Sequence, residues 1–106
     1  MAHFLFSANY TQVGIQGLLK EGAASRAEVV AGLATDLGGH LEAAYWAFGS
    51  DDFVAIAELP DNAAAAALAT TVSASGAVQV RTTVLLSAAE VDDARGRRVA
   101  YRAPGA

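Results

Sequence analysis

The chain has few side chains that could act as a nucleophile, an acid–base group or a metal ligand. It contains no cysteine, which excludes thiol catalysis, disulfides and thiolate metal sites. Its two histidines, His3 and His40, are too few for a zinc site unless carboxylates such as Glu42 or Asp52 complete it. Because His3 stands near a terminus and His40 follows a Gly-Gly helix stop, we expect surface or capping roles, with no bound metal and no cofactor.

Four residues are candidates for a general base, namely His40, Glu42, Asp52 and Glu58. An enzyme would need one of them inside a pocket with a shifted pKa, and the sequence does not identify which. The adjacent pair Asp51-Asp52 could hold a cation, but turns also favour aspartate. No Ser-His-Asp order, phosphate loop or haem-attachment motif is present. The catalytic residues therefore stay unassigned.

Two further groups could contact a ligand. Tyr10 and Tyr45 with Trp46 could line a flat pocket through stacking and phenol hydrogen bonds, and core packing accounts for them equally well. Arg81 lies in the middle of a strand-like segment whose valines alternate with polar residues. We expect it on the open face of the sheet, paired with Glu42, with Glu58 or with an anionic ligand.

Alternating apolar residues and turn signals predict the elements that position these side chains. Strand-like segments cover residues 3–10, 40–48, 53–59 and 78–86, and the turn at 49–52 makes the middle two a hairpin. Helices are predicted from Thr11 to Gly22, from a capping box Ser25–Glu28 to Gly38-Gly39, from Asp61 to about Ser75, and from a second capping box at Ser87 and Glu90.

This order predicts an α+β, ferredoxin-like βαββαβ fold with a short helix after it. A four-stranded antiparallel sheet with helices on one face is the economical arrangement. An open α/β sheet is disfavoured because the 49–52 loop is too short to connect parallel neighbours. We expect one domain over residues 1–95 and a basic C-terminal tail over residues 96–106.

Composition points to self-association. Charged residues make up 17% of the 106 residues, against a usual value of about 25%. The first strand is apolar on both faces, with Phe4 and Phe6 on one and Leu5 on the other. Such a sheet would leave an apolar face uncovered, so we expect a homodimer or a higher oligomer. The alternative is that the tail and the last helix fold back over this face.

Charge and hydropathy restrict partners and location. All eleven acidic residues precede Arg95, and four of the seven basic residues lie from Arg95 onward. The acidic body makes nucleic acid an unlikely partner, and the arginines of the tail are expected to pair with acids of this chain or its neighbour, or else to bind RNA or a phosphate. No apolar run reaches the ~18 residues of a membrane span, and no secretory leader pattern is present, so a cytoplasmic protein is expected.

Several short segments together resemble the GYD-domain family, small bacterial proteins named for a Gly-Tyr-Asp signature. The resemblance rests on Tyr10-Thr11, residues 17–22 and 37–39, Tyr45, residues 47–49 and 73–78, and Tyr101-Arg102. In Gly49-Ser50-Asp51-Asp52 the glycine and the final aspartate of the signature are kept, and Asp51 stands in place of the tyrosine. The resemblance implies a ferredoxin-like fold of the dimeric α/β-barrel type and no known activity.

Two functions follow as hypotheses. The first is a homo-oligomeric module that binds a small metabolite on its sheet face, with candidate ligand-binding residues Arg81, Tyr45, Trp46, Glu42, His40 and Asp52. The alternative is a small cofactor-independent enzyme, oxygenase- or isomerase-like, that acts on a small aromatic or keto compound. The second hypothesis rests on analogy between folds alone.

Overall fold

One antiparallel sheet and three helices packed on it make up the body of the protein. The computed structural model describes residues 1–106 and confirms the predicted element order. The elements are β1 (Ala2–Tyr10), α1 (Gln12–Glu21), α2 (Ala23–Asp36), β2 (His40–Trp46), β3 (Phe53–Leu59), α3 (Asn62–Ala74), β4 (Val78–Leu85) and α4 (Ala88–Gly96). None of these helices is both long and apolar enough to cross a membrane.

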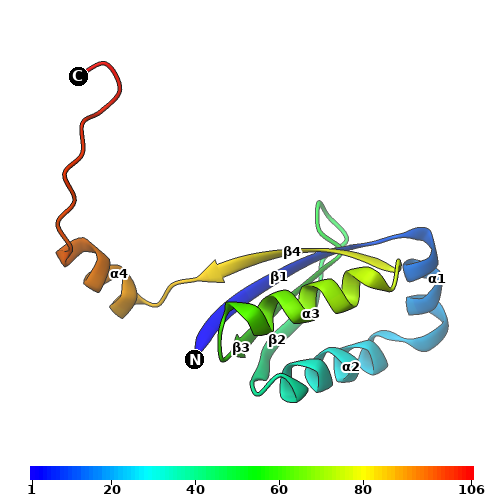
Figure 1. The fold of residues 1–106 in the computed structure, drawn as a ribbon. Coiled ribbons are helices and arrows are strands. Elements are labelled where there is room, and N and C mark those ends of the chain that lie inside the picture. The colour runs from blue at the N-terminus through cyan, green and yellow to red at the C-terminus, as the bar shows by residue number, and fades with distance from the viewer.

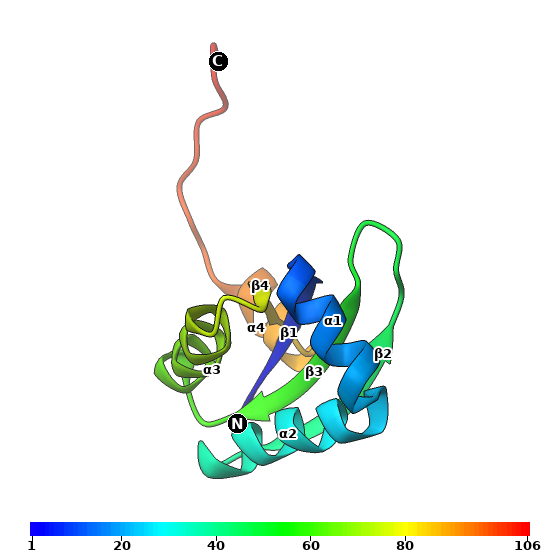
Figure 2. The same ribbon diagram turned by 90° about the vertical axis from the view of Figure 1, so that its right-hand side faces the viewer.

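The strand order in the sheet is β2-β3-β1-β4, with every neighbouring pair antiparallel. β1 and β3 are therefore the central strands, and each joins elements that are distant in sequence. Helices α2 and α3 run across the same face of the sheet, and α1 lies at the end where β1 stops (Figures 1 and 2). The chain has the expected ferredoxin-like α+β fold, with the other sheet face uncovered.

Alternation along the strands builds the core on the helix side. In β1, Phe4, Phe6 and Ala8 are buried, and in β3 every second residue from Phe53 to Leu59 is buried. Apolar residues of α2 and α3 pack against these strand residues, including Ala34, Ala65 and Leu68. Since many of these partners are alanines, the few large side chains fill most of the core volume.

Three of the four predicted helix starts are confirmed by their hydrogen bonds. Thr11 and Asp61 accept from the amides of Gly14 and Ala64, and the capping box at Ser87 is present. The capping box at Ser25 is wrong. Gly22, with a φ of 93°, ends α1 and lets α2 begin at Ala23, so Ser25 already lies inside the helix, where its hydroxyl donates to Glu21.

The capping box of α4 makes this helix sensitive to acid. The Ser87 amide donates to the Glu90 carboxylate at 2.9 Å, and this bond is the main reason that the pKa of Glu90 lies below its ordinary value of 4.5. A lowered pKa in the helical state stabilises the helix above the ordinary pKa, and the gain is lost as the pH falls through the lowered one. Helical chemical shifts of residues 88–96 are therefore expected to diminish as the pH falls below the ordinary pKa of 4.5.

A serine variant tests the same box at neutral pH. Ser87→Ala should cost α4 about 1 kcal/mol and reduce its helical chemical shifts. Ser25→Ala is the matched control, because Ser25 accepts no capping hydrogen bond and α2 should keep its shifts. Unchanged shifts in α4 after Ser87→Ala would show that the box does not hold the helix.

The C-terminal arm, residues 86–106, extends away from the body (Figure 1). Helix α4 has no buried residue, and residues after it have no regular secondary structure. The alternative in which this arm folds back over its own sheet is therefore wrong for the single chain. Two of its arginines pair locally, Arg95 with Asp92 and Arg97 with Asp93, and none pairs with the acidic body.

Candidate functional site

The uncovered face of the sheet, called here the open face, is ordered in three rows that cross all four strands. Residues that pair directly across antiparallel strands point to the same side, so the register assigns them. From β2 to β4, the rows are Tyr45, Val54, Ser7 and Arg81; Ala43, Ile56, Leu5 and Thr83; and His40, Glu58, His3 and Leu85. A mostly apolar middle row thus separates a row that contains Arg81 from a row that contains both histidines.

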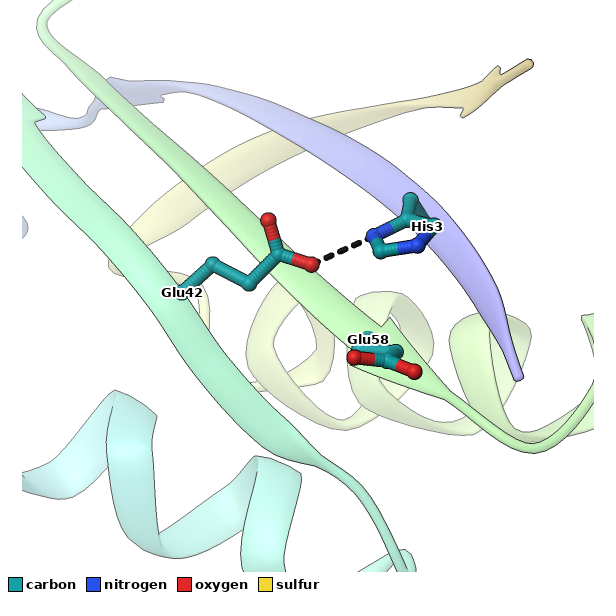
Figure 3. Close-up of side chains that lie close together, drawn as sticks. All are labelled: His3, Glu42 and Glu58. Carbon is teal, nitrogen blue, oxygen red and sulfur yellow. Dashed lines mark hydrogen bonds and ion pairs between the residues drawn. The ribbon is translucent and has the colours of Figure 1, made fainter. Parts of the chain in front are cut away.

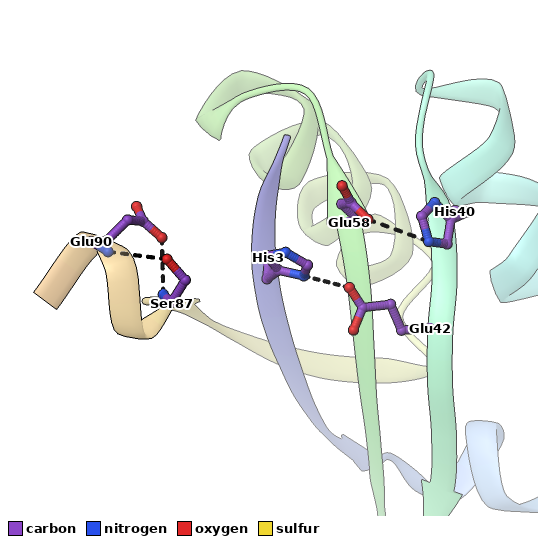
Figure 4. Close-up of polar contacts among 6 residues, drawn as sticks. All are labelled: His3, His40, Glu42, Glu58, Ser87 and Glu90. Atoms are coloured by element: carbon purple, nitrogen blue, oxygen red, sulfur yellow. Dashed lines mark hydrogen bonds and ion pairs between the residues drawn. The ribbon is translucent and has the colours of Figure 1, made fainter. Parts of the chain in front are cut away.

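The third row and the neighbouring Glu42 hold most of the titratable side chains of the open face. We call His3, His40, Glu42 and Glu58 the histidine–carboxylate cluster. Nδ1 of His3 bonds to Oε1 of Glu42, and Nε2 of His40 lies 3.4 Å from Oε2 of Glu58 (Figure 4). The ligand atoms of His3, Glu42 and Glu58 all lie within 4.8 Å of one another. Three neighbouring strands therefore bring two imidazoles and two carboxylates together.

A bulge in β2 brings Glu42 into this cluster. The register between β2 and β3 shifts between Leu41 and Ala43, which leaves Glu42 without a partner on β3. A bulge of this kind adds a residue to one strand and redirects its side chain. Glu42 reaches across β3 to His3 on β1, a residue 39 positions away in sequence (Figure 3).

Both histidines were expected in surface or capping roles, and both side chains are partly exposed, 39% for His3 and 57% for His40. His3 is the second residue of β1 and pairs with both Glu58 and Leu85, so strands on both sides fix its backbone. His40 is the first residue of β2, opposite Glu58. Neither histidine caps a helix.

At the other end of the open face, Arg81 pairs with an acid, but with neither of the expected ones. Its guanidinium contacts the Asp51 carboxylate and donates to Asn9 Oδ1 at 3.2 Å. Glu42 and Glu58 belong to the cluster two rows away from Arg81. Two rows correspond to four residues along a strand, which span roughly 13 Å. With a side chain 60% exposed, this ion pair contributes little to stability.

The two aspartates of the hairpin loop have separate roles. Asp51 pairs with Arg81, whereas Asp52 accepts a hydrogen bond from the backbone amide of Tyr10 at 2.9 Å. The amide of Asp52 in turn donates to the carbonyl of Ala8. Asp52 thereby joins the loop to the end of β1, which is a structural role.

The aromatic residues do not form one pocket, because the sheet separates them. Trp46 lies on the helix side, where its ring packs 4.8 Å from that of Phe53 and its Nε1 donates to the Tyr10 hydroxyl at 3.0 Å. Tyr45 points to the open face and is 68% exposed. Core packing therefore accounts for Trp46 and Tyr10, and Tyr45 alone remains on the open face.

The cavities include no enclosed site for a metabolite, and two of the three roomier depressions lie away from the open face, one beside α1 and one beside α3. On the helix side, a space of only about 40 Å³ is lined by Phe6, Tyr10, Trp46 and other core residues. That volume holds a water molecule but no metabolite. A shallow depression lies beside the cluster, lined by His3, Glu42, Ile56, Leu85, Leu86 and Ser87. A ligand of any size must therefore bind at the surface or between chains.

Comparison with known proteins identifies the family of the chain. The family model of the GYD domain matches residues 4–94 of the 106-residue chain. The chain belongs to the GYD domain family. No curated protein and no solved structure matches it.

Within this GYD domain, the matched residues include His40, Glu42, Glu58 and Arg81, and His3 immediately precedes them. Sequence reasoning did not include His3 and Glu58 among the ligand-binding candidates. One signal was present, since both are polar residues at the alternating positions of strands whose other residues are mostly apolar. Their convergence was not visible, because it depends on β3 lying between β1 and β2.

Proposed function

We propose that this GYD-domain protein is a homo-oligomeric module, in its simplest form a homodimer, that binds a small metabolite between two open faces. The observation that carries the proposal is the open face itself, which no element of the chain covers and which combines an apolar middle row with polar groups at both ends. Such a surface buries its apolar part and keeps its polar groups for a ligand.

The apolar residues of the open face support self-association. The solvent-exposed face of an antiparallel sheet normally carries polar side chains. Here Leu5 and Ile56 occupy the centre, and Tyr45 stands beside them, largely exposed. Exposed apolar patches of this kind mark protein or ligand contacts. A second copy apposed face to face would bury them.

The C-terminal arm gives a second, independent argument. Helices shorter than about 12 residues are marginal in water without a packing partner. The nine-residue α4 packs against nothing in its own chain, and Val99 and Tyr101 beyond it are 83% and 79% exposed. Arg98 and Arg102 have no ion-pair partner within the chain, and the body of a second copy is acidic. We infer that the arm packs on that copy.

The ligand is expected to match the chemistry of the rows. An apolar or aromatic portion would lie over Leu5 and Ile56, and a polar group would reach the histidine–carboxylate cluster. A face-to-face dimer encloses this region and removes water from it. The same residues define the chemical class of ligand, a small molecule with one flat apolar part and one hydrogen-bonding end.

The second candidate, a small enzyme acting on an aromatic or keto compound, is favoured by one specific contact. His3 bonds to Glu42, and an imidazole oriented by a carboxylate is a common general base. In the enclosed dimer, this base would lie beside the bound apolar group. Catalysis would then consist of proton transfer, without a nucleophile from the protein.

Static light scattering with Ile56→Lys tests self-association. The unmodified chain should have at least twice the mass of 10.8 kDa at micromolar concentration. Ile56→Lys places a charge in the centre of the open face and should give a monomer. Val29→Lys on the exposed side of α2 is the matched control and should keep the oligomer. A wild-type monomer at all concentrations would overturn the proposal.

A fluorescent probe tests the ligand site in the same set of proteins. Anilinonaphthalene sulfonate has a flat apolar part and an anionic end, and it should bind saturably to the wild type and to Val29→Lys. Leu5→Glu, which places a negative charge in the middle row and repels the sulfonate, should abolish this binding. Equal binding by Leu5→Glu would place the probe elsewhere and count against a ligand site on the open face.

A further inference from the structure

We propose that His3, Glu42 and Glu58 form a binding site for a divalent transition-metal ion such as Zn²⁺, with His40 as the residue that orients Glu58. All four residues belong to one chain, so the site does not depend on self-association or on the metabolite proposed above.

The donor atoms already lie close to the spacing that a metal ion requires. One atom each from His3, Glu42 and Glu58 lies within 4.8 Å of the other two (Figure 3). A tetrahedral zinc ion with bonds of about 2.0–2.1 Å holds its donors roughly 3.3 Å apart. Adjacent strands hold the three backbones close together, so small rotations of the side chains would bring the donor atoms from 4.8 Å to this shorter spacing.

The donor set indicates the class of ion. One imidazole nitrogen with two carboxylates is a mixed nitrogen–oxygen set, which suits zinc, iron and manganese. Purely oxygen-bound ions such as Ca²⁺ and Mg²⁺ gain nothing from the imidazole, and no sulfur ligand is available for softer ions. A divalent transition-metal ion therefore fits this set better than a hard cation.

The charges of the cluster favour an added cation. Two carboxylates converge there, and neither pairs with a lysine or an arginine; their only ion-pair contacts are with His3 and His40. Two nearby carboxylates repel each other when both are ionised. A bound divalent ion would compensate both charges, which the neutral form of an imidazole does not do.

His40 supplies the outer contact that metal ligands commonly have. Its Nε2 lies 3.4 Å from Glu58 Oε2, a contact that can orient this carboxylate (Figure 4). Three protein ligands leave at least one coordination position open. The shallow depression lined by Ile56, Leu85 and Leu86 adjoins His3 and Glu42, so water or a small ligand reaches that position.

Isothermal titration of the full-length, tag-free and chelator-treated chain with ZnCl₂ at pH 7.5 tests the site. One Zn²⁺ should bind per chain, whatever the oligomer, and MgCl₂ should bind at least tenfold more weakly. His3→Gln, Glu42→Gln and Glu58→Gln should each weaken Zn²⁺ binding at least tenfold, and His40→Gln roughly tenfold, as for other outer contacts. Glu28→Gln, an exposed carboxylate on α2, is the matched control and should bind as the wild type does.

Several results would overturn the proposal. They are the absence of saturable Zn²⁺ binding up to millimolar concentration, a stoichiometry of one ion per two chains, and wild-type affinity in the two glutamate variants. Because the glutamate variants keep both histidines, a loss of Zn²⁺ affinity in them distinguishes this site from adventitious binding to an imidazole alone.

X-ray absorption at the zinc edge of the wild-type complex gives an answer that does not depend on any variant folding. It should show nitrogen and oxygen donors with a single imidazole. Two imidazoles, or none, would contradict the assignment.

Discussion

Replacing Phe4 with alanine is expected to lower the free energy of unfolding by about 3–5 kcal/mol. Phe4 is only 1% exposed and is one of the two largest fully buried side chains. Its neighbours in the core include Ala34, Ala57 and Ala65. Alanines have no side-chain length with which to fill the space that the phenyl ring leaves, so the cavity persists and the cost lies at the upper end of the range. Urea unfolding followed by circular dichroism measures it.

Leu5→Ala is the matched control for this variant, because Leu5 is the next residue along β1 and points to the open face. In the dilute, monomeric chain the leucine is only partly buried, so its removal should cost about 1 kcal/mol. Equal costs for the two variants would show that β1 is not buried on the helix side alone. At higher concentration, Leu5→Ala should lower stability further if the open face is an interface, since dissociation then couples to unfolding.

Gly14→Ala is expected to be the second most damaging of these substitutions, with a loss of about 2–3 kcal/mol. A methyl group on Gly14 would overlap the carbonyl oxygen of Ala77, which is backbone and cannot rotate away. The same carbonyl accepts a hydrogen bond from the Thr11 amide at 3.0 Å, and this contact joins the start of α1 to the loop before β4. The variant must therefore displace α1 or break that bond.

Gly17→Ala in the same helix provides the control. Beyond the adjacent backbone of its own helix, no atom lies within 4 Å of the position that its methyl group would take. Alanine favours a helix over glycine by about 1 kcal/mol, so this variant should be slightly more stable than the wild type. Chemical denaturation of both variants checks the pair. A stabilising Gly14→Ala would mean that α1 does not pack as closely on residue 77 as the structure indicates.

The elements were predictable where the physical signal is local. A cap such as Thr11, Asp61 or Ser87 acts on amides two or three residues away, so the sequence contains the whole interaction. Ser25 shows the limit of this reasoning, since Ser25 and Glu28 have the spacing of a capping box but lie inside α2. Gly22, three residues earlier, permits the positive φ that starts the helix sooner.

The partners of the polar side chains were less predictable. Arg81 was expected on the open face with an acid, and it lies there. Its actual partner, Asp51, comes from a loop whose position depends on contacts with the end of β1. Trp46 was offered both as a ligand-binding residue and as core packing, and it lies partly buried on the helix side, against Phe53.

The sequence by itself determined the order of the elements and the ferredoxin-like fold, because alternation and capping are local patterns. It also indicated the family. Only the tertiary structure decided that His3, Glu42 and Glu58 converge, although the first two lie 39 positions apart in the sequence. Strand order and register set that convergence. Both result from the packing of the whole sheet against its helices, so no short stretch of sequence contains the information that determines them.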